Sequence, residues 1–437
     1  MTRSEKFSKT WEPFREVDAL DLNKDTVRGV FRSCNPTEAS FDYVGSAQLT
    51  YGSTEFSQYI QSIRREGATP DDPHERLTGI EHSWTSRNNR KGRHALTIQE
   101  AYANQYRTPS TSNSLRGILQ GVSRMFTHFS FNNTSYLVGI VFTIGCAVLI
   151  TNAILSFLPY HGWKPPDGII YAEAALTLAS TGLFLVGSTL TYLEAVNVNR
   201  GGCFGWKLER ITHSETDKSI VEKGTGTNIA PDDAHCEHHH SQQTKLVGRP
   251  RGSAKDQSKQ ECIEAPNGST ADKPSWRFFP TAYEFRTHFL YEIGFVANAV
   301  FLSSSLIFNI SSVGGLISVL SNGKVALWTR YPQFIAGIGF TAASGLLMVE
   351  TQKKWWYPAF GTLGWWINFF NCIGSVGFVF CAGFGLKENL YWAQYQFGCS
   401  YLWASLAFMF GSIGQWYEAL DKYPVQRVKE KTKKADQ

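Results

Sequence analysis

The chain has 437 residues and a formal net charge of +5, and its apolar residues are concentrated in a few long runs. The modest charge and the lack of a recognisable binding module argue against a nucleic-acid partner. Eight cysteines without a CxxC pair argue against a disulfide scaffold and against a structural zinc site. The polar start of the chain, without an apolar core or cleavage site, argues against a removable secretory signal.

The first 113 residues are polar, with scattered aromatic residues and turn-forming pairs. We expect region 1–113 to be cytosolic and to hold only local structure. The next segment, 114–131, places apolar residues at helical spacing, with Arg116 and Arg124 on the other side. This pattern predicts either an amphipathic helix in the membrane interface or a helix packed on another cytosolic segment.

Six apolar runs are long enough to cross the hydrocarbon core as helices, which takes about 20 residues. No charged side chain lies between Lys354 and Lys387 or between Glu388 and Glu418, whereas helices of a soluble bundle carry a polar face. We therefore predict an all-α integral membrane protein with six transmembrane helices. The predicted spans are 135–158, 169–193, 293–317, 331–349, 363–386 and 397–417.

Lysine and arginine near the span ends predict the orientation. Within about 20 residues of the spans, one side of the membrane receives 16 basic residues and the other receives four. The more basic side is expected to be cytosolic, which places both termini in the cytosol. The predicted order is then a hairpin at 132–198, a mostly disordered cytosolic connection at 199–285, hairpins at 286–351 and 352–420, and a basic cytosolic tail at 421–437.

A histidine-rich tract, "DDAHCEHHH", occupies residues 232–240. Such a tract can bind transition metals. It lies within the connection that we expect to be disordered, where no second shell would orient the ligands. We therefore assign neither a metal site nor a cofactor to the chain.

The three hairpins follow one sequence pattern. Each has a glycine in its first helix and, 54 to 56 residues later, a glutamate that ends its second helix. A polar residue follows the glycine by four positions, and a serine precedes the glutamate by six. The polar residues are Thr143, Asn298 and Asn368, the serines are Ser188, Ser344 and Ser412, and the glutamates are Glu194, Glu350 and Glu418. This pattern predicts three tandem two-helix repeats of parallel topology, either as a bundle with approximate threefold symmetry or as a linear array.

These repeated positions predict specific contacts. A small residue before each serine would allow neighbouring helices to approach closely, and the serine would accept or donate a hydrogen bond to the asparagine or threonine of the same hairpin. The glutamates have two interpretations. Each could pair with a nearby base, such as Arg200, Lys353 or Lys422, and fix a cytosolic rim. Alternatively, the three could form an acidic ring at a cation pathway.

Three stretches resemble a family of uncharacterised fungal integral membrane proteins related to YrhK-like two-helix domains. They are "SYLVGIVFTIGCAVLITNAILSFLP" (135–159), "GSTLTYLEAVNVNRGGCFGWKLE" (187–209) and "LGWWINFFNCIGSVGFVFCAGFG" (363–385). The resemblance implies a multi-span membrane protein and brings no reaction, ligand or catalytic residue. The middle hairpin departs from the pattern, with Ala343 where the others have glycine.

No nucleophile–base pair, phosphate-binding loop or metalloprotease helix is recognisable, so we expect no enzymatic activity. The first expectation is a structural or scaffolding protein. It would contact the lipid bilayer and use region 1–113 and the 199–285 connection for cytosolic protein partners. The alternative is a transporter or channel for cations or small solutes, with its path along the axis that relates the hairpins.

Overall fold

The computed structural model describes most of the apolar half of the chain and parts of the polar half. The described residues are 20–31, 33–43, 80–93, 95–99, 115–129, 133–198, 278–287, 289–321, 326–387, 389–420 and 425–428. They fall into two compact units, one with the long helices and one with a β-sheet. The histidine-rich tract and most of the predicted 199–285 connection lie outside these residues.

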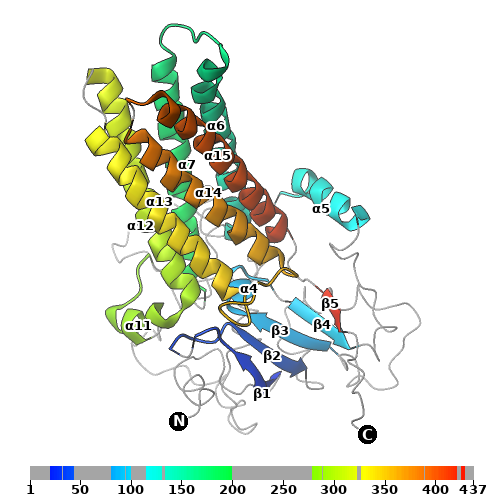
Figure 1. Cartoon of the computed structure of the whole chain (residues 1–437). Helices are drawn as coiled ribbons and strands as arrows, with labels where there is room; N and C mark the ends of the chain where they lie inside the picture. The colour runs from blue at the N-terminus through cyan, green and yellow to red at the C-terminus, as the bar shows by residue number, and fades with distance from the viewer. Residues whose placement is uncertain are drawn as a thin grey trace, which may run out of the picture. The chain divides into compact units, whose positions relative to one another are not determined.

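Six long helices form the first unit (Figure 1). They are α6 (Thr134–Phe157), α7 (Ile169–Val196), α12 (Ile293–Ser321), α13 (Ala326–Glu350), α14 (Leu363–Gly385) and α15 (Tyr391–Ala419). All six are long and apolar enough to cross a membrane. The prediction of six apolar spans is therefore confirmed, and the chain is a multi-pass membrane protein by this criterion.

The six helices make a closed ring. Each packs against the next in chain order, α6 on α7, α7 on α12 and so on, and α15 packs against α6. A linear array would leave the first and last helices apart, so this alternative does not describe the packing. Ridges of small residues help the helices to approach, because in a bilayer association relies on packing and not on the hydrophobic effect.

The three glutamates mark one end of the ring, which we call the glutamate end. Ser135 at the start of α6 donates a hydrogen bond to Glu194 near the end of α7. At the same end, Asn368 near the start of α14 donates to the carbonyl of Leu347 near the end of α13, 3.1 Å away. The hairpins therefore begin and end on the same side of the ring.

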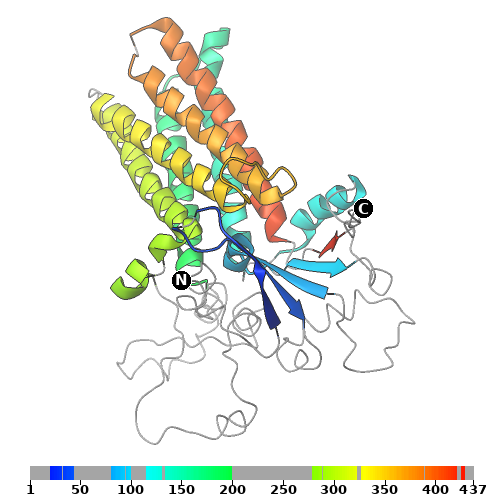
Figure 2. The ribbon, with the colours of Figure 1, turned by 60° about the horizontal axis from the view of Figure 1, so that its bottom comes forward.

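The second unit contains a five-stranded sheet in the order β1–β2–β3–β4–β5 (Figure 2). The strands are β1 (Leu20–Arg28), β2 (Glu38–Tyr43), β3 (Ile80–Thr85), β4 (Ala95–Gln99) and β5 (Val425–Val428). β1 to β4 form an antiparallel meander, and β5 joins β4 in parallel, with Leu96 opposite Val425.

This sheet corrects two expectations. The chain is mostly helical but not all-α, and region 1–113 holds more than local structure because four of its segments pair with one another and with the tail. The strands do show the period-two alternation typical of half-buried strands, as in "EASFDY" and "IEHSWT". A short helix, α4 (Ser86–Arg90), follows β3, and Thr85 caps it by accepting a hydrogen bond from the Asn88 backbone.

Helix α5 (Leu115–Thr127) also belongs to the second unit. It coincides with the predicted amphipathic segment 114–131. It ends seven residues before α6 begins, and its side chains are considered further below.

Candidate functional site

The glutamates of the repeat pattern are all buried in the helical unit. Glu194 is 8% exposed, Glu350 is 3% exposed and Glu418 is 2% exposed. Each lies within the last three residues of its helix, where the negative end of the helix dipole disfavours a carboxylate by roughly 0.3–1 kcal/mol. Ser135 offsets part of that cost by donating a hydrogen bond to Glu194.

Of the three predicted basic partners of these glutamates, the structure describes only Lys353. Arg200 and Lys422 lie outside the described residues, so pairing with them stays a prediction. Lys353, three residues after Glu350, is exposed.

Thr143, Asn298 and Asn368 occupy the same structural position in their helices. Each donates a hydrogen bond to the carbonyl of the glycine four residues earlier, at 2.7, 2.7 and 2.9 Å. The predicted contact between these residues and the serines of their hairpins is wrong. A side chain of this length reaches the carbonyl one turn back in its own helix. Asn368 donates in addition to the Leu347 carbonyl on α13.

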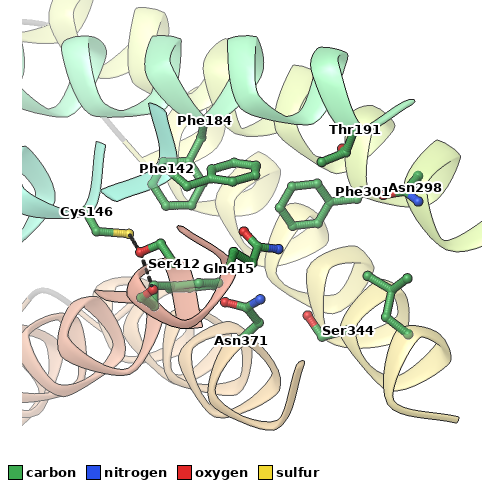
Figure 3. Close-up of a pocket in the computed structure, with 12 residues that line it drawn as sticks. Phe142, Cys146, Phe184, Thr191, Asn298, Phe301, Ser344, Asn371, Ser412 and Gln415 are labelled. Atoms are coloured by element: carbon green, nitrogen blue, oxygen red, sulfur yellow. Dashed lines mark hydrogen bonds between the residues drawn. The ribbon is translucent and has the colours of Figure 1, made fainter. Parts of the chain in front are cut away.

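The serines of the pattern are buried, but they have different surroundings. Ser188 donates to the Leu185 carbonyl of its own helix at 3.0 Å. Ser412 lies 2.8 Å from the Phe408 carbonyl and 3.4 Å from the Cys146 sulfur on α6 (Figure 3). Ser344 faces the centre of the ring.

The small residue before the serine allows close helix contact, as expected. A Cβ built on Gly187 would lie 2.6 Å from the ring of Phe142 on α6. A Cβ on Gly411 would overlap the side-chain amide of Asn371 on α14. Any larger residue would push the two helices of the hairpin apart.

A cavity lined by both apolar and polar side chains lies at the centre of the ring, between the six helices (Figure 3). Each hairpin contributes four lining residues. They are Phe142, Cys146, Phe184 and Thr191 from the first hairpin, Asn298, Phe301, Ser344 and Leu347 from the second, and Asn371, Phe408, Ser412 and Gln415 from the third. The space open to the centres of water molecules is ≈ 30 Å³. A water needs at least about 10–15 Å³ by this measure, so the cavity has room for about two waters.

The cavity includes three of the predicted site residues and omits the others. Asn298, Ser344 and Ser412 line it, whereas the three glutamates do not.

Three sets of equivalent residues lie seven positions apart on the second helix of each hairpin. Residues three, ten and seventeen positions before each glutamate lie on one helix face, because seven residues make about two turns. At three positions before, the residues are Thr191, Leu347 and Gln415, and all three line the cavity. At ten positions before, they are Phe184, Phe340 and Phe408. At seventeen positions before, they are Thr177, Gln333 and Tyr401.

The phenylalanines form a continuous aromatic layer across the ring. Their centroids are 5.0–6.0 Å apart from neighbour to neighbour. In order around the layer, they are Phe184, Phe142, Phe301, Phe340, Phe308, Phe378 and Phe408, which contacts Phe184 again. All six helices contribute, and most contacts are edge-to-face or tilted, as aromatic pairs prefer.

Four rings of the aromatic layer, those of Phe142, Phe184, Phe301 and Phe408, line the cavity. The phenylalanines of the second helices lie ten residues inside the glutamates, or about 15 Å at 1.5 Å per residue. In a hydrocarbon core about 30 Å thick, this is close to the midplane.

A group of polar side chains, which we call the second polar layer, lies on the side of the aromatic layer away from the glutamate end. Asn152 on α6 donates to Thr177 on α7 at 2.7 Å and to Tyr401 on α15 at 2.9 Å. Gln333 on α13 approaches the Cys381 sulfur on α14, 3.7 Å away. These contacts join neighbouring helices.

The aromatic layer, the second polar layer and every lining residue of the cavity other than Asn298, Ser344 and Ser412 were not predicted from the sequence. A signal for the two layers was present. Extending the hairpin alignment to ten positions before each glutamate finds three phenylalanines, and extending it to seventeen positions finds three polar residues.

Comparison with protein-family models, with curated proteins and with solved structures finds no match to this chain. The function must therefore be argued from the site itself. Among the described residues, no group of three or more histidine, cysteine or acidic side chains is placed to hold a metal ion.

Proposed function

We propose that the protein has a structural or scaffolding role, in which the six-helix ring anchors the β-sheet unit to a membrane. The aromatic layer carries this proposal. A transport pathway along the ring axis would have to pass through seven phenylalanines that contact one another across all six helices. A cavity with room for about two waters is also small for a substrate site, since ligand pockets usually measure about 300–1,000 Å³.

The proposal includes an internal repeat of three two-helix hairpins. Three observations support it: the closed ring, the matching hydrogen bonds of Thr143, Asn298 and Asn368 to glycine carbonyls, and the equal contribution of each hairpin to the cavity. A likeness to YrhK-like two-helix proteins of fungi agrees with such a repeat and belongs to the proposal as well.

Both ends of the chain are proposed to lie in the cytosol. β4 precedes the first span and β5 follows the last, and the two strands pair, which requires them to lie on one side of the membrane. The excess of basic residues on that side favours the cytosol. The sheet and the segments around it would then be the surface that cytosolic protein partners contact.

Thiol accessibility tests this proposal against a pore. The full chain would be reconstituted in liposomes as the variants Ser344→Cys, Ser412→Cys and Lys353→Cys, and treated with a membrane-impermeant thiol reagent from either side. Mass spectrometry would locate the label, so that the native cysteines do not interfere. Lys353 is exposed, and its variant is the positive control. We expect labelling of the control and none at positions 344 and 412.

Flux through the same liposomes gives a second readout. We expect no movement of monovalent cations, divalent cations or small neutral solutes above that of protein-free liposomes. Two results together would contradict the structural role. One is labelling of position 344 or 412 at the rate of the control. The other is a cation flux that changes in the triple variant Glu194→Gln, Glu350→Gln, Glu418→Gln. That combination would instead support the alternative function.

The alternative function is a transporter or channel for cations or small solutes. The polar side chains that line the cavity and the second polar layer favour it, because intramembrane polar residues often mark a transport path. The aromatic layer would then act as a hydrophobic gate between the two polar layers.

A further inference from the structure

Helix α5 presents an apolar face that is open in the structure. Leu115 is 75% exposed and Leu119 is 60% exposed. The large apolar residues recur at the spacing that places side chains on one side of a helix. The face consists of Leu115, Ile118, Leu119, Val122, Phe126 and Phe129, and each is at least 39% exposed. A contiguous apolar face of this kind marks a contact with protein or lipid.

The helix already uses a different side to pack. Gly117 and Met125, eight residues apart, are buried, and the apolar face lies to one side of that stripe. The side chains of the apolar face nevertheless keep at least 39% of their surface exposed, so this surface is accessible to another occupant.

The covalent chain keeps this helix close to the bilayer. α5 ends at Thr127 and the first span, α6, begins at Thr134. Seven residues reach at most about 25 Å even when fully extended. The end of α5 is therefore held within that distance of the point where the first span enters the membrane.

The charges of the helix suit an anionic surface. Arg116 and Arg124 lie away from the apolar face, and residues 115–129 contain no aspartate or glutamate. A helix with an apolar side, basic residues and no acidic residues binds in the plane of a membrane that contains anionic lipid.

We propose that α5 is an interfacial helix, whose apolar face inserts into anionic lipid on the side of the membrane from which the first span starts. The proposal requires that α6 crosses a bilayer, but it does not depend on whether the ring is a scaffold or a transporter.

Fluorescence quenching by brominated lipid tests the proposal on the full chain. An environment-sensitive fluorescent amino acid would replace Leu119 on the apolar face or, as a matched control, Gln120 on the opposite side. Both variants would be reconstituted in nanodiscs of phosphatidylcholine with brominated acyl chains, with or without phosphatidylserine. We expect a blue shift and loss of emission at position 119 and neither change at position 120. Phosphatidylserine should enhance the effect.

The arginines are tested by the variant Arg116→Gln, Arg124→Gln. It should lose the enhancement by phosphatidylserine and retain the weaker quenching seen in phosphatidylcholine alone. Two results would overturn the proposal. One is equal emission at positions 119 and 120, with or without brominated lipid. The other is emission at position 119 that brominated lipid does not quench and that shifts to the red when a dimer of the chain dissociates. That result would mean that a second copy of the chain, and not lipid, covers the apolar face.

Discussion

Gly139 on α6 lies directly against the backbone of Trp416 on α15. A Cβ built on Gly139 would be 2.6 Å from the Trp416 Cα, closer than real side chains approach a backbone atom. The contact joins the first and last helices of the ring. Closure of the ring therefore depends on a residue without a side chain at this position.

We expect Gly139→Ala to destabilise the helical unit by about 1–3 kcal/mol, because the added methyl group forces two backbones apart. The free energy of unfolding in mixed micelles would measure the change. Gly182→Ala on α7 is the matched control, since a Cβ at that glycine meets no atom within 4 Å. A control as destabilised as the Gly139 variant would mean that alanine is poorly tolerated throughout these helices.

The aromatic layer should contribute to stability through packing alone. Phe408→Ala is expected to lower the free energy of unfolding by about 3 kcal/mol, because Phe184 and Phe378 lose a neighbouring ring. Phe410→Ala, two residues along the same helix and 59% exposed, should change it by no more than about 0.5 kcal/mol. Equal losses for the two variants would show that the layer adds nothing beyond ordinary lipid-facing contacts.

The second polar layer should contribute less to the free energy of unfolding than the aromatic layer does. Asn152→Ala removes donors to Thr177 and Tyr401, and interhelical hydrogen bonds in membranes average about 0.6 kcal/mol each. We therefore expect a loss of about 1 kcal/mol. Thr151→Ala serves for comparison, since Thr151 is exposed and bonds only to the Ala147 carbonyl of its own helix. A loss as large as that of Phe408→Ala would indicate a more extended network.

The tail strand should protect its neighbour in the sheet. A chain that ends after Leu420 lacks β5, and we expect faster hydrogen exchange of the β4 amides, because the parallel pairing of Leu96 to Gln99 with the tail is lost. A chain that ends after Val428 keeps β5 and should exchange at the rate of the full chain. Unchanged exchange in the shorter chain would refute the pairing of β4 with β5.

The long helices were predictable because the bilayer demands a simple pattern. About 20 apolar residues without charge are sufficient evidence of a span, and their bounds in the sequence differ from those of the helices by a few residues. The sheet was not predictable in the same way. Its strands are four to nine residues long, and β5 comes from the tail that composition marked only as basic. Pairing between such distant segments leaves no local signal.

Of the residues in the repeat pattern, Asn298, Ser344 and Ser412 line the cavity, whereas Ser188, Thr143, Asn368 and the three glutamates do not. Equivalent positions in the three hairpins therefore have different surroundings. The pattern did not show that Asn368 would donate both to the Gly364 carbonyl of its own helix and to the Leu347 carbonyl on α13. The choice of acceptor depends on side-chain geometry, which spacing in sequence does not resolve.

The pairing of β4 with β5 sets an order for biosynthesis. Gln99 leaves the ribosome 326 residues before Val425. At about 5–20 residues per second, β4 waits roughly 16–65 s for its partner strand. All six apolar helices emerge during that interval. The edge of β4 is therefore open to other strands until the last helix has been made, and a nascent chain stalled before its tail would expose that edge to the cell's quality control.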